Sequence, residues 1–243
     1  MMLLSLSADS NPPKHDSEVL FTRTASSMPF TSEEALVQDF SRYEKFRSND
    51  SYGHILELDA GNGIADIGIY ELRADWQKYV DITSLRPQWT YPLVRLPYRK
   101  VFQVDDFRAL ACVSHQTAKK ILREYSLAGF CNKTSRGWIK LHQPRAPVNR
   151  IYAIEAKLRD WRKALYQASR YHDFAHQSWV LIDHYYCATA LKNRSEFIRR
   201  NVGLASIEKD GKLIIHINSK INSPKSQFRY WYAANLILKQ NLR

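Results

Sequence analysis

Apolar residues recur with a helical period near the start of the chain and with a strand period shortly after it. The segment 31–47, TSEEALVQDFSRYEKFR, places Leu36 and Phe40 on one face, and Thr31 is followed by a glutamate three positions later. Apolar positions three or four apart predict a helix, and the Thr–Glu spacing predicts its N-terminal cap. Residues 53–72 alternate apolar and polar side chains on both sides of Gly-Asn-Gly, which predicts a β-hairpin.

The middle of the chain changes from an irregular pattern to a helical one. Residues 74–97 combine two tryptophans with three prolines, so we expect a connection with little regular structure. Residues 98–142 show two successive helical patterns, with Ser114 placed to cap the second, and then a short hairpin after Gly129. The expected buried faces are Phe107, Leu110 and Ala111 in the first helix and Ala118, Ile121, Leu122 and Tyr125 in the second.

Strands and helices alternate in the C-terminal part. A buried strand begins at Ile151 and contains a charged pair. Alternating strands and helices predict an α/β fold, with a mixed central sheet flanked by helices. The further expected elements are a helix over 161–175, a strand over 178–184, a helix over 189–201, a hairpin over 204–219 and a helix over 228–242.

The composition limits the metal sites and the cellular location that we expect for the protein. Three widely spaced cysteines among 243 residues are too few for a four-cysteine zinc or iron–sulfur site, and they favour a cytoplasmic location, nucleoid-associated if the source is bacterial. No run of about 18 apolar residues is present, so no membrane contact is expected. Residues 1–30, rich in Ser and Pro, predict a flexible arm without the basic segment of a secretory signal.

The strand that begins at Ile151 carries charge inside an apolar run. Because side chains alternate faces along a strand, Glu155 and Lys157 point to the same side. Asp66, in the second strand of the early hairpin, offers a second carboxylate. Two carboxylates with the carbonyl of Ala156 form a set of hard oxygen ligands suited to Mg²⁺, and Lys157 can offset charge on a phosphate. An ion pair at a sheet edge is the simpler alternative.

The order of these elements resembles the PD-(D/E)xK nuclease superfamily, which has the restriction-endonuclease-like fold. The hairpin carries Asp66, the later strand carries Glu-Ala-Lys, and the next helix carries Gln167 and Tyr171 in the QxxxY spacing of the RecB-like branch. Ala65 stands where the family motif has proline. Asp59, at the end of the preceding strand, is a rival for the first carboxylate.

The resemblance implies a role for each matching residue. Asp66, Glu155 and the carbonyl of Ala156 would bind Mg²⁺ or Mn²⁺. A supporting acid is implied in the first helix, where Glu33 and Glu34 both remain candidates, although a capping role is a sufficient explanation for Glu34. The catalytic residues implied are Asp66, Glu155, Lys157, Gln167 and Tyr171.

A long insertion separates the two metal-binding strands, and residues 98–145 of it resemble a winged helix-turn-helix. They contain ten Lys and Arg against three Asp and Glu, a large part of the net charge of +12, which favours a polyanionic partner. The alternatives to a DNA-binding role are a helical insert whose charges are only solvated and a protein-binding module. The candidate DNA-contacting residues are His115, Gln116, Lys119, Lys120 and Arg123 in the second helix and Lys133 and Arg136 at the hairpin tip.

Three histidines, His172, His176 and His184, lie close together in the sequence. The first two are four residues apart on an expected helix, a spacing that can bind zinc. No glutamate stands beside them in an HExxH pattern, so exposed or backbone-bonded histidines are the simpler interpretation.

These observations predict a Mg²⁺-dependent DNA endonuclease that hydrolyses phosphodiester bonds. Residues 31–97 and 146–243 would form the nuclease core, and residues 98–145 would bind duplex DNA. A homodimer is expected by analogy with nucleases that cut both strands. The alternatives are a non-cleaving DNA-binding regulator or assembly subunit, and a nuclease subunit that works only inside a larger nucleoprotein complex.

Overall fold

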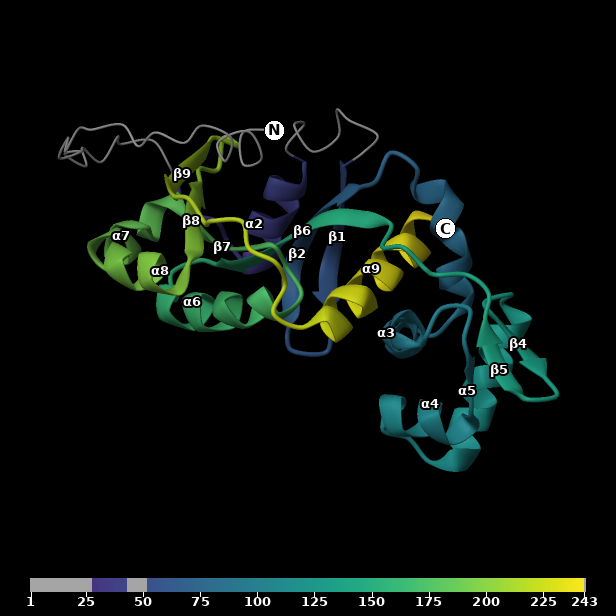
Figure 1. Cartoon of the computed structure of the whole chain (residues 1–243). Helices are drawn as coiled ribbons and strands as arrows, with labels where there is room; N and C mark the ends of the chain where they lie inside the picture. Colours follow the sequence, from purple (N-terminus) through teal and green to yellow (C-terminus); the bar gives the residue numbers. More distant parts are fainter. Residues whose placement is uncertain (1–27, 43–51, 243) are drawn as a thin grey trace.

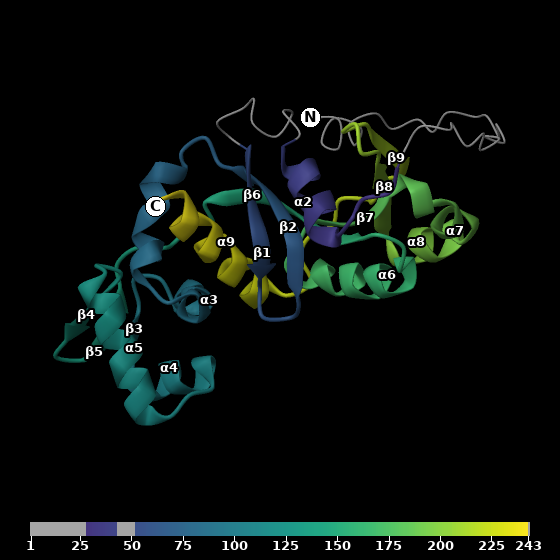
Figure 2. The ribbon, with the colours of Figure 1, turned by 180° about the vertical axis from the view of Figure 1, so that it is seen from behind.

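The structure, a computed structural model, describes residues 28–42 and 52–242. A six-stranded mixed sheet lies between helices, and a three-stranded sheet with two helices projects from one end (Figures 1 and 2). This confirms the expected α/β architecture. The expected arm, residues 1–30, lies outside the described residues except for its last three. No helix in the described ranges has the length and apolar character needed to cross a membrane.

The large sheet has the strand order β1-β2-β6-β7-β8-β9. The outer pairs are antiparallel, and the three central strands β6, β7 and β8 run parallel. The expected hairpins and buried strands are therefore confirmed. The strands are β1 (Tyr52–Asp59), β2 (Ile64–Leu72), β6 (Val148–Lys157), β7 (Gln177–Asp183), β8 (Val202–Ile207) and β9 (Leu213–Ile217).

Alternation along β6 divides the core into two layers. Ile151 and Ala153 face one hydrophobic cluster, whereas Tyr152 and Ile154 face the other. Helix α2 (Glu33–Ser41) packs against the side of the sheet that carries Tyr152 and Ile154. The remaining helices of the core cover the side that carries Ile151 and Ala153. Those helical segments are α6 (Trp161–Arg170), η3 (Tyr171–Asp173), η4 (His184–Tyr186), α7 (Ala188–Lys192), α8 (Arg194–Arg200) and α9 (Gln227–Asn241).

Helix α2 is capped by a different residue from the one that the sequence predicts. Ser32 precedes the helix, and its hydroxyl accepts a hydrogen bond from the N–H of Ala35 at 3.1 Å. The predicted cap Thr31 is therefore wrong by one position, because Ser32 has the extended backbone that aims its side chain at the first turn. The helix ends at Ser41, and the rest of the segment predicted as helix, apart from Arg42, lies outside the described residues.

The segment 74–97 is helical, which corrects the expectation of an irregular connection. It forms η2 (Trp76–Ser84) and α3 (Pro87–Arg95). Pro87 occupies the start of α3, where no intrahelical donor is needed, so it favours the helix. Tertiary contacts also stabilise both helices. Asn235 of α9 donates to the carbonyl oxygen of Ile82 at 2.6 Å and to Oγ1 of Thr90 at 3.0 Å.

The insert follows the expected order of helix, helix and hairpin, with one additional short strand. The Ser114 hydroxyl accepts from the N–H of Thr117 at 3.2 Å and caps the second helix as predicted. Leu110 was expected in the core but is exposed, because the short first helix buries only Phe107 fully. The elements are β3 (Val101–Phe102), α4 (Val104–Ala111), α5 (His115–Leu127), β4 (Cys131–Thr134) and β5 (Gly137–Lys140).

Lys140 joins the insert to α3. Its buried ammonium group donates to the carbonyl oxygens of Leu93 and Val94 at 3.2 Å each and to Oε1 of Gln143 at 2.6 Å. An ammonium group has three N–H donors, so all are satisfied, and the carbonyls belong to the negative end of a helix. The hydrophobic core also continues from the sheet through α3 into the insert. The insert is therefore held against the core rather than tethered by a loop.

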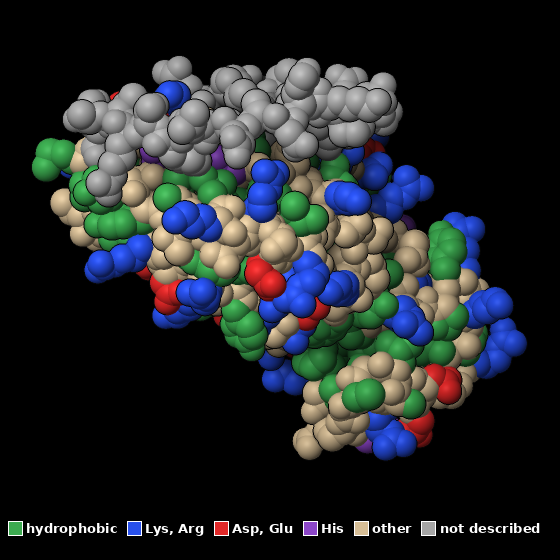
Figure 3. Space-filling model, turned by 90° about the vertical axis from the view of Figure 1, so that its left-hand side faces the viewer, with side chains coloured by type: hydrophobic (Ala, Val, Ile, Leu, Met, Phe, Trp, Pro, Cys, Tyr) green, Lys and Arg blue, Asp and Glu red, His purple; other side chains and the backbone are tan. Residues whose placement is uncertain are grey.

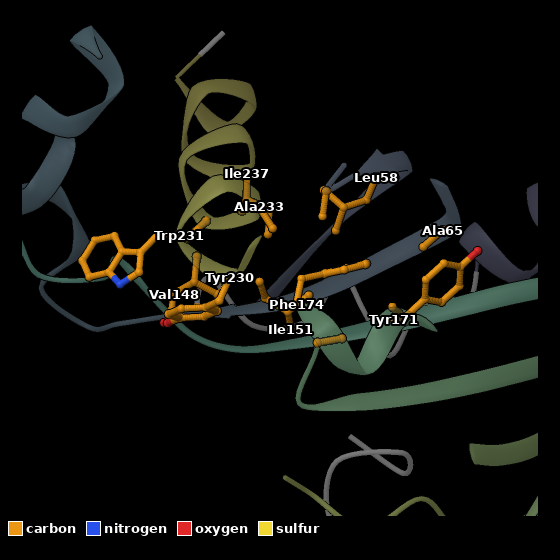
Figure 4. Packing of buried hydrophobic residues seen from close by; sticks show 14 of the residues in the cluster. Leu58, Ala65, Val148, Ile151, Tyr171, Phe174, Tyr230, Trp231, Ala233 and Ile237 are labelled. Carbon is orange, nitrogen blue, oxygen red and sulfur yellow. The ribbon is translucent and has the colours of Figure 1, made fainter. Parts of the chain in front are cut away.

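Helix α9 fixes the start of β6. Figure 4 shows Tyr230, Ala233 and Ile237 of this helix facing the sheet near Ile151. The Tyr230 hydroxyl donates to the carbonyl oxygen of Val148, and the ring of His176 packs edge-on against the Tyr230 ring. Because β6 carries the charged residues, this packing sets the position of the candidate site.

We expect the stability of the protein to fall as the pH drops from about 6.5 to about 4. Burial, and then the charge of Arg150, lowers the pKa of His176 from 6.5 to about 4. Its Nδ1 accepts from the N–H of Ile151 at 3.1 Å, so the folded state needs the neutral ring. In this pH window the unfolded chain binds a proton that the folded imidazole excludes, which costs up to about 3 kcal/mol.

Thermal unfolding at pH 7.5 and 4.5 measures this effect. His176→Asn should show a smaller loss of stability on acidification than the natural chain, while His142→Asn, a change of an exposed histidine, should show the same loss. An equal pH dependence in all three proteins would mean that His176 does not control acid stability.

Candidate functional site

The candidate site lies where β2 and β6 separate. Their paired register ends at Ile67 and Ile154, and Asp66 lies one residue beyond this point on β2. The N–H of Ala156, past the end of the register, donates to Oδ2 of Asp66 at 2.7 Å. A side chain thus replaces the missing strand partner, which keeps a buried backbone donor satisfied and places the carboxylate beside β6.

Four oxygen atoms surround the ammonium group of Lys157. Burial favours the neutral amine, but the hydrogen bond to Glu155 and the charges of Glu155 and Asp66 outweigh it and raise the pKa of Lys157 above its usual value. Lys157 is therefore a cation at neutral pH. The distances from its Nζ are 2.9 Å to Oε1 of Glu155, 2.9 Å to the carbonyl oxygen of Ala156, 3.1 Å to Oε2 of Glu33 and 3.8 Å to Oδ2 of Asp66.

Negative charge exceeds positive charge in this cluster. Three carboxylates face one lysine. Burial raises the pKa of Glu155, against the lowering effect of the Tyr171 hydrogen bond. Burial also raises the pKa of Asp66, against the N–H donated by Ala156. Burial is the main cause of both raised pKa values, and the excess of negative charge follows from the count of three carboxylates against one lysine, which a second cation would relieve.

Tyr171 holds Glu155 in place. Its hydroxyl lies within hydrogen-bonding distance of Oε2 of Glu155 and 2.6 Å from the carbonyl oxygen of Ile64. Burial and the hydrogen bond to Glu155 raise the pKa of Tyr171 well above its usual value, so the phenol keeps its proton. The one hydroxyl proton serves only one of the two oxygens at a time, and the phenol thereby links η3, β2 and β6.

Gln167, which lies one helical turn before Tyr171, is not bonded to the acidic cluster as the tyrosine is. Its Oε1 is buried and has no hydrogen-bond partner among the described residues. Within that part of the chain no hydrogen bond joins it to Asp66, Glu155 or Lys157. A buried acceptor without a donor costs about 1–3 kcal/mol, so it is a candidate for contact with a bound water or ligand.

The structure shows which of the alternative acids lie next to Lys157. Glu33 reaches Lys157, whereas the side chain of Glu34 bonds to Ser32, which lowers the pKa of Glu34. Glu34 is therefore bonded to the cap residue, but not in the capping box that the sequence predicts, because Ser32 rather than Thr31 starts the helix. Asp59 accepts from the N–H of Gly61 at 2.7 Å and shapes the hairpin turn, so Asp66 is the carboxylate next to Lys157.

Glu57 is a further acid that sequence reasoning did not identify. It has a left-handed backbone, with φ of 54°, inside β1, and the β1–β2 register omits the pair that would join it to Asp66. Its charge also contributes to the raised pKa of Asp66. Ile55 and Leu58 are both buried, which strict alternation forbids, so this spacing is the sequence signal of a local irregularity of β1 at Glu57.

The expected DNA-contacting residues of the insert form an exposed basic surface. Gln116, Lys119, Lys120 and Arg123 line a shallow hollow on α5. No acidic partner of these three cations is found among the described residues. Lys133 and Arg136 at the hairpin tip and His115 at the start of α5 are exposed too, and His115 lies 3.2 Å from Asp105.

Basic side chains are also frequent elsewhere on the molecule. In Figure 3, Lys and Arg outnumber Asp and Glu on the face that it shows. The histidines have other partners: Nε2 of His172 lies 3.1 Å from the carbonyl oxygen of Arg200, and His176 bonds to Ile151. The backbone-bonded interpretation of His172 and His176 is thus confirmed.

Comparison with known proteins supplies no further assignment. No protein-family model, no curated protein and no solved structure matches this chain.

Proposed function

We propose that the protein is a metal-dependent deoxyribonuclease of the PD-(D/E)xK type, with a winged-helix insert that holds duplex DNA. The observation that carries this proposal is the convergence of three carboxylates and one carbonyl oxygen on a single buried point, now taken by the Lys157 ammonium group. The elements that supply these groups follow the order of that superfamily, and the exposed cations of α5 provide a separate surface for a phosphate backbone.

The donor set fits Mg²⁺ or Mn²⁺. Carboxylate and carbonyl oxygens are the ligands that these hard cations prefer, and a bound cation would relieve the excess of negative charge. Asp66, Glu155 and the carbonyl of Ala156 would hold the metal. When bound, it would polarise the phosphate and lower the pKa of a water molecule.

The surrounding residues would complete the site. Tyr171 restrains Glu155, so that a carboxylate oxygen stays aimed at the site. Gln167 offers a buried acceptor that a water molecule can satisfy. Lys157, charged at neutral pH, would offset negative charge that develops on the phosphate during hydrolysis.

A second function is favoured by one observation. Lys157 is within ion-pair distance of all three carboxylates, so the cluster is partly neutralised without a metal. Such a cluster can serve as a structural ion-pair network, with the insert acting alone as a DNA-binding surface. The chain would then be a non-cleaving regulator or an assembly subunit of a larger nucleoprotein complex.

Cleavage of supercoiled plasmid and linear duplex DNA with Mg²⁺ or Mn²⁺ distinguishes the two functions. We expect Glu155→Gln and Lys157→Met to reduce cleavage roughly 100-fold or more, since each removes a charge at the reacting phosphate. Asp59→Asn is the control, because that side chain shapes a turn, and it should retain activity. If all four proteins bind DNA equally and none cleaves it, the non-cleaving function is correct.

The two neighbouring glutamates of α2 give a matched pair of variants. Glu33→Gln should slow cleavage and raise the metal concentration needed for half-maximal rate, because it removes negative charge beside Lys157. Glu34→Gln should change both quantities less, because that side chain bonds to Ser32 and the charge of Lys157 is the smallest influence on it. Equal effects of the two changes would contradict a role for Glu33 in the site.

Replacing Lys119 and Arg123 by alanine should weaken binding of duplex DNA. The slope of log affinity against log salt concentration should become shallower by about 1 for each lost phosphate contact. Lys209→Ala, which changes an exposed lysine in the β8–β9 turn, is the control for net charge. Titrations at several salt concentrations measure this, and an unchanged slope in the α5 variants would exclude α5 as the DNA surface.

A further inference from the structure

A second cluster of metal-binding residue types lies outside the candidate catalytic site. His184 belongs to η4, Cys187 follows it directly, and His216 lies in β9. One ligand atom from each of the three lies within 4.8 Å of the other two. The sequence separates His216 from the other two, so only the fold brings the three side chains together.

Hydrogen bonds aim the two imidazole rings at a common point. The hydroxyl oxygen of Ser206, in β8, lies 2.9 Å from Nδ1 of His184 and 2.7 Å from Nε2 of His216. The two rings are nearly parallel, with 14° between their planes. The Sγ atom of Cys187 lies 3.8 Å from Nδ1 of His184. The thiol and one nitrogen of each ring therefore converge on the Ser206 hydroxyl, which an ion bound by all three would displace.

The donor set and its spacing suit zinc. Two imidazoles and a thiolate are borderline and soft ligands, which Zn²⁺ binds and Mg²⁺ does not favour. Tetrahedral Zn²⁺ with the usual bond lengths separates a sulfur and a nitrogen ligand by about 3.5 Å. The 3.8 Å between Sγ of Cys187 and Nδ1 of His184 is close to this value, and all three ligand atoms lie within 4.8 Å of one another, so the side chains would have to close around the ion.

A carboxylate lies near the second ring nitrogen of His184, beyond hydrogen-bonding distance. Its Nδ1 faces the cluster, and its other nitrogen, Nε2, lies 3.9 Å from Oε1 of Glu208. A histidine that binds zinc commonly directs its second ring nitrogen at a carboxylate, which fixes the tautomer and the ring orientation. Glu208 could take this role after a movement of a few tenths of an ångström or more toward the ring.

We propose that His184, Cys187 and His216 bind one Zn²⁺ ion, with a water molecule or another group as the fourth ligand. The ion would cross-link η4 to β9 across β8. Asp183, which begins η4, accepts from the N–H of Phe30 at 2.8 Å, so the same turn also holds the segment that leads into α2. The site is structural, and it is separate from the oxygen cluster around Lys157.

Metal analysis of the purified full chain, produced with added zinc and passed over a desalting column, tests the proposal. We expect about one equivalent of zinc per chain. Cys187→Ser and His216→Asn should lower this roughly tenfold or more. Cys112→Ser, a change of an exposed cysteine, and Glu155→Gln, a change in the other site, should retain the zinc.

Cobalt binding by the natural chain makes the test independent of whether the variants fold. Co²⁺ added to the metal-free protein should produce a thiolate-to-cobalt charge-transfer absorption, and added Zn²⁺ should abolish it. A chelator should lower the melting temperature of the natural chain and of Glu155→Gln alike. Substoichiometric zinc together with no thiolate–cobalt band would overturn the proposal, and the cluster would be a hydrogen-bonded group only. Neither readout depends on DNA cleavage.

Discussion

The site depends on how one buried ammonium group is neutralised. Lys157 lies among carboxylates from α2, β2 and β6, so three segments far apart in sequence are bound to one charge. Removing Glu155, the fully buried partner, would cost the most, on the order of 3 kcal/mol, because it leaves the buried lysine less compensated, and the half-exposed Glu33 would cost less. The network therefore fixes the end of β6 against β2 and α2, at the point where the strand ladder has already ended.

The same ladder explains how a large insert interrupts the core without disturbing it. The chain leaves β2 at Leu72 and returns at Val148, and these two residues are paired neighbours in the sheet. The ends of the insertion are thus held close by the fold, so the insert adds little loop-closure cost to the core. Lys140 and Tyr125 then anchor it to α3, with Tyr125 donating to the carbonyl oxygen of Trp89 at 2.6 Å.

The two proposed metal sites share one edge of the sheet but differ in chemistry. Lys157 is in register with Ile182, and Ile182 is in register with Ser206, so both clusters lie near the carboxyl ends of the parallel strands. At these strand ends the backbone pairing stops, and side chains from neighbouring strands converge. Oxygen donors around Lys157 suit a hard cation, and the nitrogen and sulfur donors around Ser206 suit a softer one, so the two sites would not compete for the same ion.

The sequence by itself determined the local elements and the alternation that brings Glu155 and Lys157 to one side of β6, because both follow from periodicity within a few residues. It also identified Asp66 and Tyr171, through the order of the elements. Tertiary structure alone decided the rest. Glu33 rather than Glu34 reaches Lys157 because Ser32 starts the helix.

The helices of residues 74–97 and the convergence of His184, Cys187 and His216 also needed the tertiary structure. Proline and tryptophan in the first segment concealed a helical conformation that packing against α9 stabilises. The three ligand candidates lie on elements that the pairing of β7, β8 and β9 brings together. Local periodicity carries no information about such distant contacts, because they depend on how whole strands and helices pack.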